Sequence, residues 1–174
     1  DGRPSPEAHF YAKLEAFLPH AERCDLCPLL ESLRLIKSER ELALMRRAGE
    51  LSAAAVVAAI RSSQPGLMEY HLGAVADYVY LAGGANGPGY RPIIAGGDNI
   101  WNAHYFRNNC PLKPGELVLM DYAPDCGNYT SDIGRMWPVN GRYSPTQREL
   151  YGFVVEYHKV LLQIIRPGKL VREL

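Results

Sequence analysis

The chain has 174 residues, of which 47% are hydrophobic and 22% charged, a composition typical of a globular protein with one packed core. Nineteen basic residues balance nineteen acidic ones, and no basic stripe alternates with aromatic residues, so we expect no nucleic-acid partner. The uncharged run at 51–60 is about half a membrane span, so we expect no membrane partner either. No signal-peptide pattern opens the chain, which favours a cytoplasmic location.

The first 34 residues resemble a linker or the tail of a preceding domain, which leaves 35–174 for the main domain. They combine one short amphipathic stretch, at 9–18, with four prolines, Pro4, Pro6, Pro19 and Pro28. Cys24 and Cys27 have the spacing of half a zinc site or of a redox pair. Because no second pair of Cys or His follows at similar spacing, we interpret both cysteines as incidental.

Two helices are predicted in the first half of the main domain. Ser38 and Glu41 form a capping box, in which each side chain can bond the backbone amide of the other residue. Apolar residues then recur with a period near 3.6 as far as Ile60, where Gln64-Pro65-Gly66 ends the run. A second helix is expected at about 69–81.

The second half reads as short strands followed by one helix. Strand-like runs at 90–95, 117–123 and 129–139 are separated by Gly, Pro and Asn, which is typical of a sheet rich in hairpins. Ser144 and Gln147 form a second capping box with a proline between them, so a further helix should begin there. This order of elements predicts an α+β fold, with helices packed on one face of a largely antiparallel sheet.

Two strand-like runs each carry an aspartate, Asp121 and Asp132. If Cys126-Gly127 is a two-residue turn, these aspartates lie directly opposite each other, with Cβ atoms about 5 Å apart. Facing carboxylates repel, so the pair needs a shared proton, an arginine or divalent cations. Arg135 is the cation close in sequence, but on a regular strand it points to the other face unless a bulge at Gly134 reorients it. From the pattern alone, two exposed aspartates beside a turn remain an equal alternative.

His104 is the histidine that we single out as a candidate catalytic residue. It lies in a polar stretch, Asn102-Ala-His104-Tyr105, where it could donate a proton or bind substrate through a hydrogen bond. A structural role for a lone histidine is the alternative. Asp125, at the turn itself, and the other four histidines are interpreted as structural or solvated, since none of those histidines has a metal-spaced partner.

Together these residues resemble the creatinase/aminopeptidase P group of metallopeptidases, over about 33–174. The resemblance implies the amino-terminal part of a pita-bread catalytic domain, an α+β fold. It rests on four features: the 34–41 run into the first helix, the Asn102–Tyr105 motif, the spacing of eleven between Asp121 and Asp132, and the 142–151 stretch.

The resemblance also implies a site. In such enzymes the first aspartate binds one metal and the second bridges two, usually manganese, cobalt or zinc, so Asp121 and Asp132 take these roles. A later His and two Glu complete the centre in the family. The matching histidine, here His104, stabilises the tetrahedral intermediate formed when metal-bound hydroxide attacks the peptide carbonyl.

The 142–151 stretch and His104-Tyr105 look more like the Xaa-Pro branch, aminopeptidase P or prolidase, than like methionine aminopeptidases. This implies a peptide substrate with proline at the second position, and we expect a homodimer. The 133–137 segment departs from the family, since relatives more often show Ile-Thr-Arg-Thr-Phe there. The later His and Glu ligands are not in this chain, so we expect it to be inactive alone.

Two other functions are compatible with the same fold. One is a non-catalytic pita-bread module that binds peptides or proteins, and the other is a creatinase-like amidinohydrolase. The binding module is disfavoured because Asp121, Asp132 and His104 are retained. The amidinohydrolase is disfavoured because both aspartates remain, whereas other residues typically replace them in creatinase-like enzymes.

Overall fold

The computed structural model of the protein describes residues 4–174. The chain separates into two compact parts, one ending at Ser38 and the other running from Glu39 to Leu174. The first part holds α1 (Pro6–Phe17) and α2 (Cys27–Leu35), neither of which has a buried residue. Helix α2 was not expected. Its proline, like that of α1, lies within the first two helical positions, where a missing N–H group costs nothing, so these prolines begin helices.

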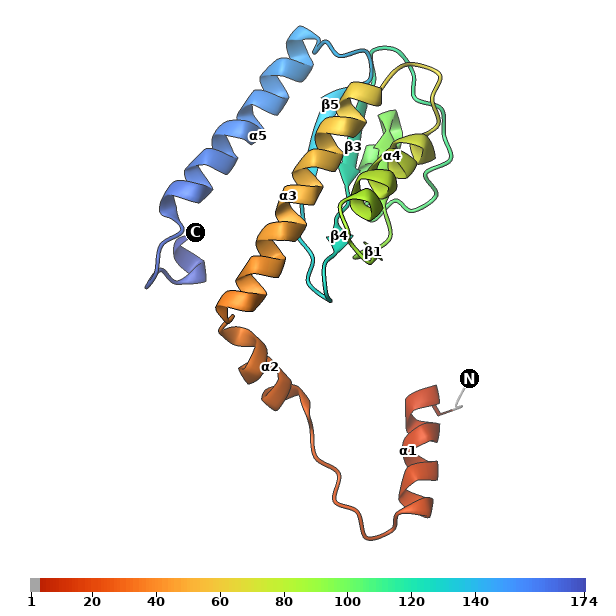
Figure 1. The fold of residues 1–174 in the computed structure, drawn as a ribbon, viewed down its shortest axis with the longest axis vertical. Helices are drawn as coiled ribbons and strands as arrows, with labels where there is room; N and C mark the ends of the chain where they lie inside the picture. Colours follow the sequence, from red (N-terminus) through yellow and green to blue (C-terminus); the bar gives the residue numbers. More distant parts are fainter. Residues whose placement is uncertain (1–3) are drawn as a thin grey trace. The chain divides into compact units, whose positions relative to one another are not determined.

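Two long helices, α3 (Glu39–Ser62) and α4 (Glu69–Ala82), pack against each other in the second part (Figure 1). Their limits confirm the two helices predicted from the sequence. The buried residues of α3 recur every three or four positions and are mostly small, which allows close approach of the two helices. They are Ala48, Leu51, Ser52, Ala55, Val56 and Ala59.

A three-stranded antiparallel sheet lies behind these helices, in the order β2 (Ile93–Gly96), β3 (Leu117–Asp121) and β5 (Gly134–Pro138). All three strands are shorter than the runs expected from the sequence. A separate two-stranded antiparallel sheet pairs β1 (Gly87–Pro88) with β4 (Pro124–Asp125). This arrangement of helices and small antiparallel sheets confirms the α+β class.

The two faces of β3 have different environments. Val118 and Met120 are fully buried in the core that α3 and α4 share with the sheet. Leu117, Leu119 and Asp121 alternate with them and are only partly buried, as a period of two requires. Asp121 therefore lies on the face of the sheet that points away from α3 and α4.

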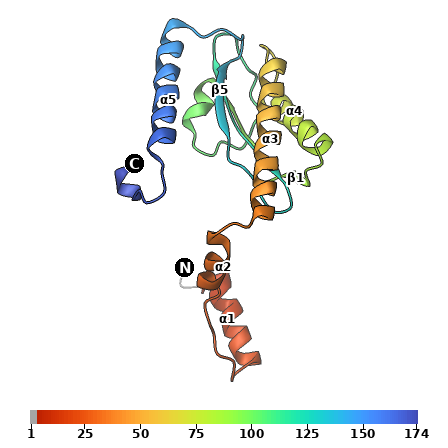
Figure 2. The same ribbon diagram turned by 60° about the vertical axis from the view of Figure 1, so that its left-hand side comes forward.

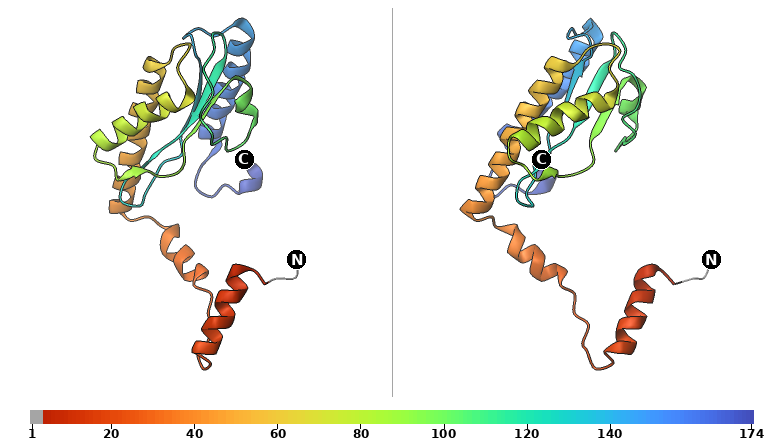
Figure 3. Two further views of the ribbon diagram at one scale, coloured as in Figure 1. Left: turned by 90° about the vertical axis from the view of Figure 1, so that its right-hand side faces the viewer. Right: turned by 45° about the vertical axis from the view of Figure 1, so that its right-hand side comes forward.

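Helix α5 (Pro145–Ile164) begins at the predicted capping box. The Ser144 Oγ accepts from the Gln147 backbone N–H at 3.2 Å, and the Gln147 Oε1 accepts from the Ser144 N–H at 2.9 Å. The helix lies beside β5, on the other side of the strands from α3 (Figures 2 and 3). The expected packing of helices on one face of the sheet thus holds for α3 and α4, whereas α5 lies on the other side of the strands. A short 3-10 helix, η2 (Val171–Glu173), follows.

A pair of tyrosines joins α4 to the end of β3. The Tyr80 hydroxyl, which is fully buried, donates to the Tyr122 backbone carbonyl at 2.9 Å, and the two rings meet edge to face at 5.2 Å. The Tyr122 hydroxyl in turn donates to Asp77 of α4. These contacts hold the chain immediately after Asp121. Among residues 4–174, none of the helices combines the length and apolar character needed to cross a bilayer.

Candidate metal and catalytic site

The hairpin that carries the two aspartates turns one residue later than expected. Cys126 and Tyr129 pair across the turn, and Gly127 and Asn128 between them have φ values of 62° and 66°. A two-residue turn with both φ values positive suits Gly and Asn, whereas a cysteine at that position would be strained. The Asp125 Oδ1 accepts from the Asn128 N–H at 2.6 Å. Asp125 is therefore a turn-stabilising residue.

The later turn changes which residues face each other. Asp121 lies opposite Gly134, so the direct pairing of Asp121 with Asp132 is wrong. The partner of Asp121 is thus two residues further along the chain than expected, and a shift of two preserves the alternation of faces. Asp132 lies two residues before β5 begins. A Cβ built on Gly134 would stand 3.9 Å from the Cβ of Asp121, so the glycine leaves space beside that carboxylate.

Tyr90 lies close to both aspartates. Its hydroxyl donates to the Asp121 Oδ1 at 2.6 Å. Burial is the main cause that raises the pKa of Tyr90, and the hydrogen bond to Asp121 and the negative charges of Asp121 and Asp132 raise it further. Asp121 thus contacts the Tyr90 hydroxyl directly, whereas Asp132 acts on it through its charge; Asp121 is partly buried and Asp132 is partly buried to the same class.

The chemistry of these groups suits a hard divalent cation, because both aspartates offer carboxylate oxygens. Arg135 lies opposite Met120 and donates to the Gly134 carbonyl at 2.7 Å, so its guanidinium is engaged elsewhere. Within residues 4–174, no group of three or more His, Cys, Asp or Glu side chains is arranged to hold a metal ion. Asp121 and Asp132 together would supply only part of a coordination shell.

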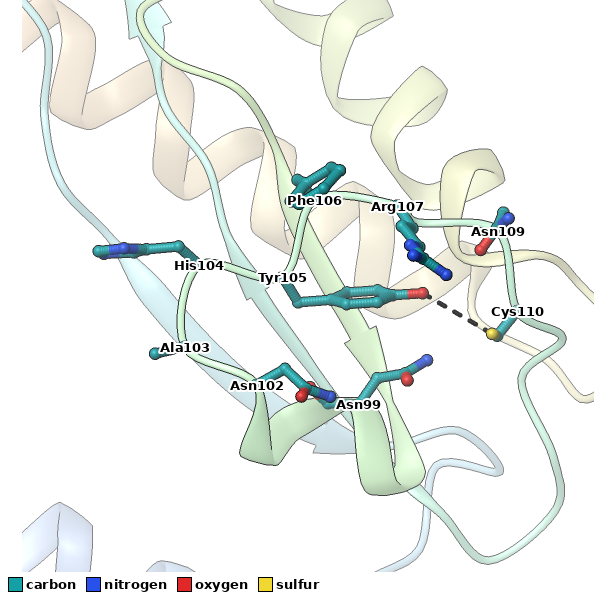
Figure 4. Close-up of a pocket in the computed structure, with 9 residues that line it drawn as sticks. All are labelled: Asn99, Asn102, Ala103, His104, Tyr105, Phe106, Arg107, Asn109 and Cys110. Carbon is teal, nitrogen blue, oxygen red and sulfur yellow. Dashed lines mark hydrogen bonds between the residues drawn. The ribbon is translucent and has the colours of Figure 1, made fainter. Parts of the chain in front are cut away.

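His104 lies in the segment that connects β2 to β3, after the 3-10 helix η1 (Gly97–Trp101). It is exposed and has a φ of 54°, a conformation uncommon for a residue other than glycine. It lines a cavity of about 370 Å³ together with Asn102, Tyr105 and Phe106, among others. Figure 4 shows its ring pointing away from Tyr105 and Cys110. Neither aspartate lines this cavity.

Two residues near the site were missed in the sequence. Tyr90 was assigned only to the start of a strand, but it precedes β2 and bonds Asp121. Glu69 begins α4, where an acidic residue is ordinary, yet it is fully buried and accepts four hydrogen bonds. No local pattern marks either residue, because both roles depend on partners more than 25 positions away.

Comparison with known proteins now identifies the family. The model of metallopeptidase family M24 matches residues 43–174. The chain belongs to this family. It is 38% identical over 153 residues to the Xaa-Pro aminopeptidase of Escherichia coli, which covers 88% of this chain and 35% of that protein. It is 40% identical over 140 residues to Xaa-Pro aminopeptidase 3 of Rattus norvegicus, which covers 80% of this chain and 28% of that protein.

Solved structures agree with this assignment. Proline aminopeptidase P II from Yersinia pestis matches 99% of this chain and 42% of its own, with a TM-score of 0.88 and 35% identity. A variant of Escherichia coli aminopeptidase P in complex with substrate matches 97% of this chain and 40% of its own, with a TM-score of 0.85 and 33% identity. These matches confirm the resemblance and the fold expected from it. The chain spans less than half the length of these relatives.

Proposed function

We propose that this chain is part of a metal-dependent peptidase that removes the first residue of peptides with proline at the second position, as an Xaa-Pro aminopeptidase or dipeptidase. The observation that carries the proposal is that the Asp121 carboxylate, at the end of the strand next to β5, accepts a hydrogen bond from Tyr90, while Asp132 lies two residues before β5 and its charge helps to raise the pKa of Tyr90. The names of the similar proteins, Xaa-Pro aminopeptidases of bacteria and mammals, support this substrate class.

In this proposal Asp121 and Asp132 are metal ligands. Tyr90 occupies only the Oδ1 atom of Asp121, so the remaining lone pairs of that carboxylate are free to bind a cation, and the hydrogen bond orients it. A pair of manganese, cobalt or zinc ions, when bound, would polarise the peptide carbonyl and activate water. A zinc-substituted Escherichia coli aminopeptidase P has been solved in complex with product, which supports the choice of a divalent ion.

His104 binds the substrate in this proposal. His104 is exposed and is one of the residues that line a cavity of about 370 Å³, within the size range of small-ligand sites. There it would donate a hydrogen bond to the carbonyl oxygen as negative charge develops on it. The peptide would lie between His104 and the aspartates.

We further propose that residues 35–174 belong to the catalytic domain, which continues with the missing His and Glu ligands. Residues 1–34 would connect this domain to a preceding one, and the enzyme would be a homodimer. Two carboxylates alone supply neither the coordination number nor the geometry that divalent ions need. The 174-residue chain should therefore bind manganese weakly and hydrolyse nothing by itself.

The test compares this chain with a protein extended to the full length of its relatives. Manganese binding is measured by calorimetry, and proline-containing peptides are assayed for release of the first residue. Tight binding and turnover by the extended protein alone are expected. If neither protein binds metal or cleaves peptide, while peptides still bind, the chain belongs to a non-catalytic module.

The metal ligands are tested in the extended protein with two matched variants in one hairpin. Asp121→Asn should abolish hydrolysis and weaken manganese binding, because it removes a carboxylate ligand. Asp125→Asn is the control, since asparagine can still accept the hydrogen bond from Asn128 that stabilises the turn. Equal losses in the two variants would show that the effect of Asp121→Asn comes from the hairpin rather than from the metal.

A further inference from the structure

Glu69 is a buried carboxylate whose four hydrogen bonds all come from one segment. Its Oε1 accepts from the Gly96 N–H at 2.8 Å and from the Asn99 Nδ2 at 2.9 Å. Its Oε2 accepts from the Tyr105 hydroxyl at 2.8 Å and from the Cys110 N–H at 3.0 Å. One carboxylate oxygen therefore holds the chain before His104, and the other holds the chain after it.

The four donors match the hydrogen-bonding capacity of an ionised carboxylate, which accepts two bonds on each oxygen. Glu69 is 0% exposed, and it begins α4, where the helix dipole favours a negative charge. Its own backbone N–H donates to the Cys110 carbonyl at 3.0 Å. Figure 4 shows three of the donor residues, Asn99, Tyr105 and Cys110, around the cavity lined by His104.

The segment held by Glu69 has a conformation that it would not adopt without support. His104 and Asn108 have φ values of 54° and 48°, in the left-handed region that side chains disfavour. Such residues persist only where the surrounding contacts determine them. Asn108 supplies a second anchor, because its side chain accepts from the Ile94 N–H and donates to the Pro92 carbonyl, each at 2.8 Å.

We propose that Glu69 is a positioning residue, whose buried carboxylate holds the 96–110 segment in the conformation that presents His104 to the substrate. The inference rests on the proposed role of His104. Glu69 itself touches neither substrate nor metal in this account. It acts because it joins both ends of the segment to the first turn of α4.

The first test uses hydrogen exchange in the extended protein, with Glu69→Gln as the variant. Glutamine keeps the shape but replaces one acceptor oxygen by an NH₂ group that faces two donors. Exchange of the backbone amides at 96–110 should rise about tenfold or more, because losing a hydrogen bond to a charged group destabilises a segment by an amount that corresponds to such a change in rate. Exchange at 117–121 should stay unchanged. Leu72→Ala, a buried change on the same helix, is the control for a general loss of stability. Unchanged exchange at 96–110, or equal increases in both variants, would overturn the proposal.

The second test is kinetic and separates this inference from the proposed function. Glu69→Gln should lower kcat for a proline-containing peptide about 100-fold, the size of effect expected when a catalytic group is misplaced, with a smaller change in KM. In the His104→Ala background the same change should cost little more, because Glu69 acts through His104. Losses that multiply would overturn the inference. Full activity of His104→Ala would instead refute the proposed role of His104, and the exchange experiment would still decide whether Glu69 anchors the segment.

Discussion

Tyr80→Phe tests the junction between α4 and the strand that carries Asp121. The tyrosine is fully buried, and its hydroxyl donates to the Tyr122 backbone carbonyl at 2.9 Å. Phenylalanine fills almost the same space and keeps the edge-to-face contact with the Tyr122 ring. The change therefore removes the hydroxyl that donates to the Tyr122 carbonyl and opens no large cavity.

The expected cost follows from what the substitution leaves behind. A buried carbonyl that loses its donor destabilises a protein by about 1–3 kcal/mol. For a loss of about 2 kcal/mol and a urea m-value of about 2 kcal/mol/M, the midpoint of unfolding should fall by about 1 M. The m-value itself should not change, because the folded and unfolded states expose the same surface as before.

The matched control is Tyr78→Phe, on the same helix two residues earlier. Tyr78 is 74% exposed, so its substitution should change the free energy of unfolding by less than about 0.5 kcal/mol. Both variants are unfolded in urea and followed by circular dichroism. Equal midpoints for the two variants would refute the reasoning, since the hydroxyl of Tyr80 would then contribute nothing beyond that of an exposed tyrosine.

Two further predictions concern stability. Gly97→Ala should lower the free energy of unfolding by about 1–2 kcal/mol, because Gly97 has a φ of 53°. Gly49→Ala, in open space within α3, should instead raise the free energy of unfolding by about 0.5–1 kcal/mol. Urea unfolding compares the two variants, and a Gly97→Ala protein as stable as the unsubstituted one would contradict the first prediction. Burial raises the pKa of Tyr80 and Tyr122 above the ordinary value near 10. The folded protein then keeps protons that the unfolded chain loses, so the free energy of unfolding should fall as the pH rises above about 10. Urea midpoints are measured from about pH 8 to 11, and midpoints that do not fall over this range would exclude the linkage.

Local signals in the sequence were sufficient for the helices of the main domain. The capping box at Ser144 and Gln147 is present as predicted, and α4 begins at Glu69 as expected. The 3.6-residue period located α3, but Met45 and Ile60, which belong to the same apolar pattern, are 37% and 43% exposed. Periodicity indicates which face of a helix is apolar, and only the neighbouring elements determine how much of that face is covered.

The sequence by itself determined the family, the α+β class and the candidates Asp121, Asp132 and His104, because these depend on residue types and spacings along the chain. The tertiary structure decided which residues lie together. The hairpin register depends on the positive φ values at Gly127 and Asn128, and one residue of difference in the turn moved Asp132 away from the position opposite Asp121. The partners of Glu69 lie 27 to 41 positions away, and the partner of Tyr90 lies 31 positions away. Their contacts therefore exist only once α4, the sheet and the 96–110 segment have packed together.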